Sequence, residues 1–415
     1  LWGGYYSAIA AANMALNAIE EKGNPASLDP QRGEALVCRA YCHFMLANIF
    51  CNAYDTHASQ SLGVPYMEEV ETTVSPRYER GTLEEVYRKV ERDLLEGIDL
   101  ISDDSYSVPK YHFTRKAAYA FAARFYLYYM KPDFSNCDRV IDFATRVLGT
   151  NPADLLRNWE ALGNLSVNGN VQADAYIASS NEANLLISST VSNWGAIGSD
   201  YLIGPRYFHN QTLATSETCL SSGLWGSSDY FYLKPFSTNG FVASILRKSG
   251  LYEGTYLYYM PVLFSTDETL LCRAEAYALK KMYAQSAADI TSWQRAYTRN
   301  KSVLTPEQIN TYYDRMSFYT PFTQQTPKKK LAPDFMIEEG MQENFIHCIL
   351  HIRRITTLHE GMRWPDIKRY GILIYRRDMA NQRVTDEMPP NDLRYAIQIP
   401  RSVIVAGIQP NPRRN

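Results

Sequence analysis

Apolar side chains recur at steps of three and four residues along much of this chain, which is the spacing that builds one face of an α-helix. At the start of the chain this stripe is formed by Tyr5, Ile9, Ala12, Leu16 and Ile19. The segment 23–30, GNPASLDP, ends the pattern with one glycine and two prolines. A second stripe runs from Ala35 to Ile49, so the first fifty residues predict an antiparallel pair of helices.

The same pattern predicts further helices before residue 150. Thr82 and Glu85 have the spacing of a capping box and stand directly before another apolar stripe. A helix is predicted to start near Thr114, and its many alanines would let a neighbouring helix approach closely. Ser135 is placed to cap the next helix, which completes a second helical hairpin.

The character of the chain changes between residues 160 and 255, where Gly, Ser, Asn and aromatic residues become frequent. The segment 183–190, ANLLISST, predicts a short strand. The rest predicts long loops, which in a compact protein usually have a function. Helices are predicted again at 267–283, 286–299 and about 335–358. The segment 393–400, LRYAIQIP, predicts an extended piece docked on the body of the protein.

The overall charge argues against a nucleic-acid partner. The chain carries a formal net charge of -2, whereas a nucleic-acid-binding face needs an excess of cations to displace counterions. The one dense cationic run, Lys328 to Lys330, is interpreted as a solvated loop.

Nothing in the sequence predicts a membrane-spanning helix or a signal peptide. Leu1 runs directly into a helical pattern, so we expect that an N-terminal segment has been removed.

No local catalytic, cofactor or metal motif is present. The seven cysteines show no Cys-x-x-Cys pair, and the chain has no G-x-S-x-G, H-E-x-x-H, Walker or G-x-G-x-x-G motif. We therefore predict a protein that is not an enzyme and needs no cofactor. A glycoside hydrolase is a less favoured alternative, because its two carboxylates meet only in the fold.

Several segments together resemble the SusD/RagB family of nutrient-binding outer-membrane lipoproteins. The strongest is HEGMRWPDIKRYG (359–371), which is similar to the family pattern Glu-Gly-x-Arg-Trp-x-Asp-x-Lys-Arg. Glu360, Arg363, Asp366 and Arg369 follow one another at three-residue steps, so they are interpreted as a structural ladder of ion pairs. The other resembling segments follow in the family's order: 39–50, 63–69, 82–101, 113–130, 267–279, 393–400 and 407–413.

The resemblance implies a fold. It implies a mainly α protein, with a tetratricopeptide-like scaffold of helical hairpins and a loop-rich, partly irregular second half. The whole chain, 1–415, would be a single SusD-like domain. Its parts would be a scaffold mainly at 1–150 and 265–370, a loop-rich ligand-binding region at about 155–260, and a C-terminal docking tail at 371–415.

The resemblance also implies a function. Such a protein binds oligosaccharide or polysaccharide on the cell surface and delivers it to a partner SusC-like, TonB-dependent outer-membrane transporter. It would be held at the outer membrane by an N-terminal lipid anchor that this chain does not contain. A peptide- or protein-binding lipoprotein of the RagB type is the main alternative.

Aromatic residues on loops are the predicted ligand contacts. A sugar ring packs its C–H face on an aromatic ring, and its hydroxyls need planar polar partners close by. The central region offers Trp194, Asp200, Tyr201, Trp225, Tyr230 and Tyr232, and the early loop offers Tyr78. The alternative is that these rings anchor the long loops onto the scaffold. Because the chain has 31 tyrosines, some of them must line helix contacts.

Overall fold

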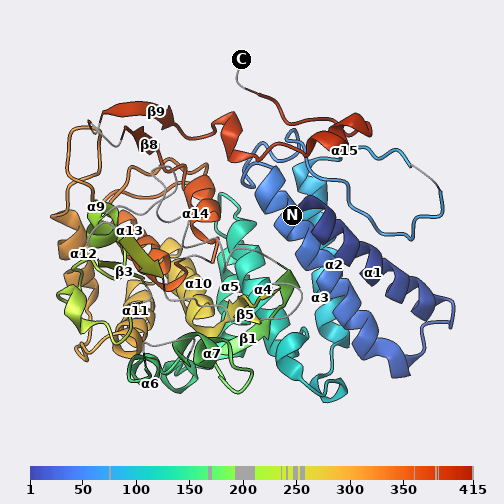
Figure 1. Cartoon of the computed structure of the whole chain (residues 1–415), viewed down its shortest axis with the longest axis horizontal. Coiled ribbons are helices and arrows are strands. Elements are labelled where there is room, and N and C mark those ends of the chain that lie inside the picture. Colours follow the sequence, from blue (N-terminus) through green and yellow to red (C-terminus); the bar gives the residue numbers. More distant parts are fainter. Residues whose placement is uncertain are drawn as a thin grey trace.

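The computed structural model describes most of the chain. The described residues are 1–73, 76–166, 171–191, 211–234, 236–239, 242–245, 251–252, 258–358, 360–378, 381 and 383–413. Helices dominate these residues and pack side by side, while the strands are short and lie around them (Figure 1). The expectation of a mainly α protein is confirmed.

Three helices open the chain as predicted. Helix α1 (Trp2–Glu20) packs on α2 (Asp29–Phe50), and α2 packs on α3 (Leu83–Leu100). The backbones of α2 and α3 approach closely where Gly33 meets Gly97. A Cβ atom on Gly97 would lie 2.7 Å from the carbonyl oxygen of Gly33, so a side chain there would push the two helices apart.

The predicted caps are confirmed at two helices and wrong at a third. The hydroxyl of Thr82 accepts a 3.1 Å bond from the amide of Glu85, and the Glu85 carboxylate accepts a 2.8 Å bond from the amide of Thr82. Thr114 caps α4 (Arg115–Tyr128) through the amide of Ala117. Ser135 precedes α5 (Asn136–Leu148) but makes no side-chain cap bond, because its backbone is already helical.

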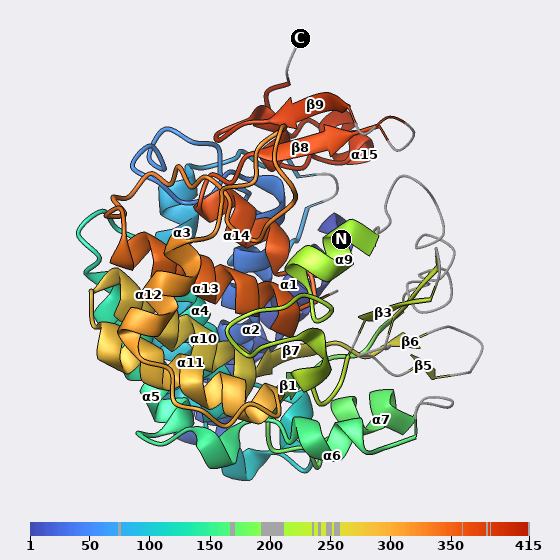
Figure 2. The same ribbon diagram turned by 90° about the vertical axis from the view of Figure 1, so that its left-hand side faces the viewer.

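Helix α10 (Thr266–Leu279) joins the early helices to the late ones (Figure 2). It packs on α4 and α5, and also on α11 (Tyr283–Tyr297) and α13 (Met341–Thr356). Almost every residue of α10 is buried, as a central position requires.

Two late helices differ from the prediction. Helix α13 begins at Met341 and not near residue 335, because Gly340 before it has a φ of +90°, which no helix tolerates. Helix α12 (Pro306–Asp314), which packs on α13, was not predicted. Thr305 and Gln308 form a capping box at its start, and Pro306 occupies the first turn, where a proline costs no hydrogen bond.

The described strands form small antiparallel sheets. The strand predicted at 183–190 is confirmed as β1 (Asn184–Ile187), which pairs with β7 (Val262–Ser265). Near the C-terminus, β8 (Ile374–Arg377) and β9 (Val384–Met388) pair with each other.

The remaining strands are β2 (Thr190–Val191), β3 (Phe236–Asn239), β4 (Val242–Ile245), β5 (Leu251–Tyr252) and β6 (Tyr258–Tyr259). The short helices are α6 (Trp159–Gly163), α7 (Val171–Ile177), α9 (Gln211–Glu217), α14 (Arg363–Arg369) and α15 (Arg401–Val405).

The C-terminal segment is fastened to the end of α2. The amide of Ile397 donates a 3.0 Å bond to the carbonyl oxygen of Ile49, and the Asn411 side chain donates a 2.8 Å bond to that of Phe50. Arg80 of the early loop donates a 2.8 Å bond to the Asn411 side chain. The C-terminal segment is therefore held against the end of α2 and the early loop.

A buried network of charges connects α10, α13 and α14. Asp366 accepts a 2.9 Å bond from Arg353 and lies 3.3 Å from Arg369, and Arg369 also donates a 2.6 Å bond to Glu275. The expected pairing of Asp366 with Arg369 is therefore confirmed. The ladder itself is not, because its other members point elsewhere: Glu360 accepts a 2.8 Å bond from Tyr176 on α7.

Within the residues that the structure describes, no helix has the length and the apolar character needed to cross a bilayer. All seven cysteines fall in the described part of the chain and carry free thiols.

Candidate functional site

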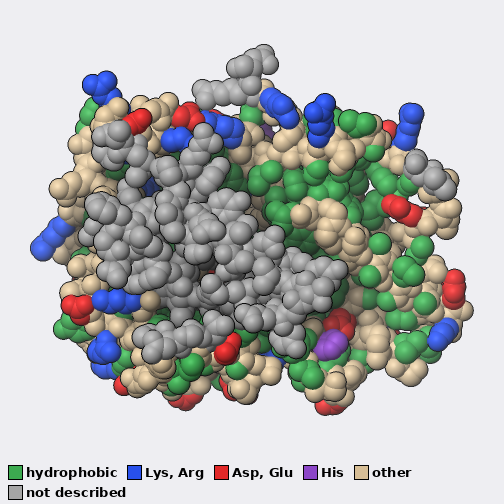
Figure 3. All heavy atoms as spheres, viewed as in Figure 1, with side chains coloured by type: hydrophobic (Ala, Val, Ile, Leu, Met, Phe, Trp, Pro, Cys, Tyr) green, Lys and Arg blue, Asp and Glu red, His purple; other side chains and the backbone are tan. Residues whose placement is uncertain are grey.

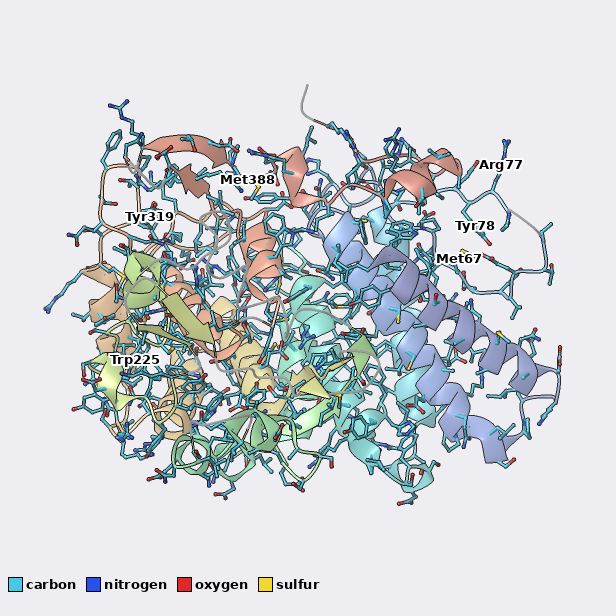
Figure 4. The ribbon with its side chains drawn as sticks, viewed as in Figure 1. Met67, Arg77, Tyr78, Trp225, Tyr319 and Met388 are labelled. Carbon is cyan, nitrogen blue, oxygen red and sulfur yellow. The ribbon has the colours of Figure 1, made fainter. Side chains whose placement is uncertain are left out.

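The predicted ligand residues do not form one site. Trp194, Asp200 and Tyr201 lie outside the described residues. Tyr78 and Trp225 lie on opposite sides of the molecule (Figure 4). One ligand therefore cannot touch both of these rings.

Trp225 is buried, so the expectation that its ring stands out in water is wrong. Its side chain is only 1% exposed, and its ring centroid lies 5.2 Å from that of His351 and 5.6 Å from that of Trp293. Gly223 and Gly226 exchange two backbone hydrogen bonds of 2.9 Å, and this tight turn directs the indole inward. Trp225 anchors its loop on α11 and α13.

The other described candidates are more accessible. Tyr230 is 44% exposed. Tyr232 is half-buried, and the charged ends of Arg299 and Lys301 lie 5.1 and 4.9 Å from its ring centroid. Tyr78 is half-buried on the early loop and donates its hydroxyl proton to Glu71. Ligand contact by these three tyrosines stays a prediction.

A groove that was not predicted lies under the β8–β9 hairpin and has a volume of about 750 Å³. We call it the hairpin groove. Its walls are α9, the loop 319–329, the adjoining parts of α13 and α14, the segment 372–378, and Thr385. Figure 2 shows the hairpin above α14, with α9 below it. A second cavity of about 670 Å³ lies beside α12 and α13. Half of its lining residues are charged, and Phe318 is its one described aromatic residue.

Aromatic rings line one side of the hairpin groove. The ring centroids of Tyr319 and Tyr375 lie 5.6 Å apart, with the two planes at 78°. Phe322 also lines the groove and is 97% exposed. Because Gln324 and Thr323 lie on the same loop, apolar ring faces and polar side chains are presented together.

Tyr319 is held in place by two cations. The guanidinium of Arg377 donates a 3.0 Å bond to its hydroxyl, and Nζ of Lys329 lies 3.9 Å from its ring centroid. A ring that is fixed by two such contacts loses little conformational entropy when a ligand packs on it.

Opposite charges meet at the floor of the groove. Glu217 is 1% exposed, accepts a 3.0 Å bond from Gln325, and forms ion pairs with Lys329 and Arg354. Burial alone would raise the pKa of Glu217, but the charges of Arg354, Lys329 and Arg363 hold it far below its ordinary value. Burial lowers the pKa of Lys329 to about 8, although the Glu217 carboxylate opposes that shift.

These pairs correct the interpretation of Lys328 to Lys330 as a solvated loop. Lys328 is buried and donates a 2.8 Å bond to the carbonyl oxygen of Tyr313, and Lys329 is buried against Glu217. Of the three, Lys330 alone is exposed. A run of like charges could become buried because each of the first two finds its own acceptor.

The sequence does contain a signal for the groove. The segment 317–326, SFYTPFTQQT, and the segment 373–378, LIYRRD, combine tyrosines with amides and guanidinium groups, as sugar sites do. Composition alone does not single them out, because they lie outside the loop-rich centre of the chain. Within the described part of the chain, no group of three or more His, Cys, Asp or Glu side chains is placed to hold a metal ion.

The N-terminal part of the chain matches a known family. Residues 1–127 match the SusD-like family described as starch-binding and associating with the outer membrane. No curated protein matches the chain.

Solved structures share the fold over nearly the full length. A candidate sugar-binding protein from Bacteroides vulgatus ATCC 8482 is 19% identical and has a TM-score of 0.66, covering 99% of this chain and 84% of its own. A SusD superfamily protein from Bacteroides thetaiotaomicron VPI-5482 is also 19% identical, with a TM-score of 0.62 over 99% and 85% of the two chains. A SusD-like carbohydrate-binding protein from Bacteroides vulgatus ATCC 8482 is 15% identical, with a TM-score of 0.62 over 98% and 82%. Residues 1–127 therefore match the SusD-like family in sequence, and nearly the whole chain has the fold of solved SusD superfamily proteins.

Proposed function

We propose that this protein binds an oligosaccharide in the hairpin groove and performs no chemistry on it. The observation that carries the proposal is the pairing of Tyr319 and Tyr375 with polar side chains in an open groove of about 750 Å³. The family description and the sugar-binding relatives support carbohydrate as the ligand class.

The cellular setting is part of the same proposal. The chain would act as a lipoprotein on the outer face of the outer membrane and pass its sugar to a SusC-like, TonB-dependent transporter. The tetratricopeptide-like face of the early helices would be the docking face for that partner. The family's association with the outer membrane supports this placement. Co-purification of the full-length protein with a transporter from the native host would test it.

A binding screen tests the ligand class. The purified protein would be titrated by calorimetry with neutral oligosaccharides, acidic oligosaccharides and peptides, and the products of a long incubation would be analysed by chromatography. We expect binding of at least one oligosaccharide and no cleavage. Binding of peptides alone would favour the RagB-type alternative, and measurable cleavage would refute the claim of no chemistry.

Substitutions then locate the site. Tyr319→Ala and Tyr375→Ala should each weaken sugar binding about tenfold, as loss of a stacking ring does. Tyr111→Ala is the matched control, because Tyr111 is 45% exposed and is not among the residues that line the groove. Tyr78→Ala, Tyr230→Ala, Tyr232→Ala and Trp194→Ala test the loop residues that remain predictions. If only these loop variants lose affinity, the ligand does not bind in the hairpin groove.

A further inference from the structure

The hairpin groove carries more positive than negative charge. Its described lining includes five cationic side chains, Lys329, Arg354, Arg363, Arg376 and Arg377, against two carboxylates, Glu217 and Asp378. The space-filling view shows Lys and Arg side chains along the edge where Figure 1 places β8 and β9 (Figure 3). A groove for a purely neutral sugar would not need this excess.

Glu217 does not balance the whole cluster. Its carboxylate is already engaged by Lys329, Arg354 and Gln325. These contacts leave the neighbouring guanidinium of Arg363 without a carboxylate of its own.

Arg363 has carboxylates near it, but none among the described residues is in direct contact with it. No ion pair joins its guanidinium to a carboxylate among the described residues, and its buried Nε atom has no hydrogen-bond partner there. Burial and the nearby charge of Arg354 lower the pKa of Arg363 to about 10, although the Glu217 carboxylate opposes this shift. The guanidinium therefore stays charged at neutral pH.

An unpaired cation of this kind is unusual inside a protein. Arginines elsewhere in this core are matched, for example Arg124 with Glu268 at 2.9 Å and Arg273 with Asp289 at 2.8 Å. Removing a guanidinium from water without a partner costs free energy, which a bound anion would recover. Arg363 lines the groove, so a ligand placed there can supply that anion.

We propose that the hairpin groove is specific for acidic oligosaccharides, and that a carboxylate or sulfate group of the sugar pairs with Arg363. The sugar ring that bears the anion would lie beside Tyr319 and Tyr375. Arg376, which is exposed at the rim, would add attraction at longer range. This inference rests on the proposed function and names the chemical class of the ligand.

The test compares ligands that differ in charge. Calorimetry would measure binding of an oligogalacturonide, a sulfated oligosaccharide and a neutral gluco-oligosaccharide, each at low and at high salt. We expect at least one of the acidic sugars to bind about tenfold or more tightly than the neutral one at low salt, as one charge-assisted contact provides. The advantage should shrink at high salt because the charges are screened. The two acidic ligands distinguish a uronate carboxylate from a sulfate ester.

Substitutions assign the effect to residues. Arg363→Gln should weaken acidic-sugar binding about tenfold and weaken neutral-sugar binding much less, while Arg363→Lys, which keeps the charge, should retain part of the affinity for the acidic sugar. Arg376→Gln removes an exposed cation, so it tests the same idea without risk to folding, and we expect a loss of about threefold. Arg88→Gln is the control, because Arg88 is an exposed arginine on α3 outside the groove.

The outcomes separate the two proposals. Equal or tighter binding of the neutral sugar overturns the specificity for acidic ligands and leaves the proposed function standing. Acidic-sugar binding that is unchanged in Arg363→Gln and Arg376→Gln overturns the role of these cations. If no oligosaccharide binds at all, the proposed function fails as well.

Discussion

Nη2 of Arg369 on α14 lies 2.6 Å from Oε1 of Glu275 on α10. Glu275 is fully buried, accepts a 2.5 Å bond from the hydroxyl of Tyr370, and also forms an ion pair with Arg353 on α13. One carboxylate therefore joins α10 to α13 and α14, which come much later in the sequence. Helix α14 also carries Arg363 into the hairpin groove.

The first prediction concerns that carboxylate. Glu275→Gln should lower the free energy of unfolding by about 3–5 kcal/mol, because Arg353 and Arg369 would remain buried without their counter-charge. Urea denaturation measures the change. The control is Asp138→Asn, which breaks a more exposed ion pair with Lys280 and should cost less than about 1 kcal/mol. Similar losses in both variants would show that the Glu275 network has no special role.

The second prediction concerns the close approach of α2 and α3. Gly97→Ala would place a Cβ atom 2.6 Å from Cγ2 of Val37 and 2.7 Å from the carbonyl oxygen of Gly33. We expect a loss of about 1–3 kcal/mol from overpacking. Gly4→Ala is the matched control, since a Cβ there meets no atom within 4 Å and should stabilise α1 by about 0.5–1 kcal/mol. Thermal unfolding of both variants tests whether Gly97→Ala lowers the stability and Gly4→Ala raises it.

The third prediction separates packing from ligand contact at two rings. Trp225→Ala should cost about 3–5 kcal/mol of stability, because the ring is buried among other aromatic rings. Phe322→Ala, at a ring that is 97% exposed, should change stability by less than about 0.5 kcal/mol. Chemical denaturation of the two variants gives the comparison. A stable Trp225→Ala variant would contradict the packing role.

The fourth prediction is a pH dependence. Burial lowers the pKa of His43 from 6.5 to about 3, and its Nε2 atom accepts a 3.0 Å bond from the amide of Met67, which protonation would break. As the pH falls, His43 therefore takes up its proton at a higher pH in the unfolded chain than in the folded protein. The contribution of neutral His43 to the free energy of unfolding is fully present above about pH 6.5, and below that pH it decreases by about 1.4 kcal/mol per pH unit.

Unfolding free energies measured between pH 7 and pH 5 test this prediction. Gln at position 43 can still accept the Met67 bond but does not titrate in this range. The slope should therefore be shallower in His43→Gln than in the wild type. An unchanged slope in that variant would mean that His43 does not titrate as described.

Many of the helices could be predicted because the sequence patterns that indicate them are local. Helix α3 shows both a capping box at Thr82 and a regular apolar stripe, and each depends only on residues within a few turns of one another. Helix α12 was missed because Pro306 and its polar neighbours resemble a loop, although Thr305 and Gln308 supply the same capping signal.

The groove could not be predicted in the same way. At its floor, Glu217 pairs with Lys329 and Arg354, and each of these two residues lies more than a hundred positions after Glu217 in the sequence. No periodicity brings such residues together, because their meeting depends on how α9, α13 and the loop 319–329 pack. The same argument applies to Trp225, whose burial depends on α11 and α13.

One wall of the hairpin groove is a hairpin whose two described strands, β8 and β9, bond to each other and to no other described strand. The buried charges around Glu275 lie on helices and do not involve these strands. Insertions or substitutions in the hairpin can therefore accumulate during evolution without loosening the helical frame. Proteins that descend from one ancestral chain could therefore change their ligand specificity by changes in this hairpin alone.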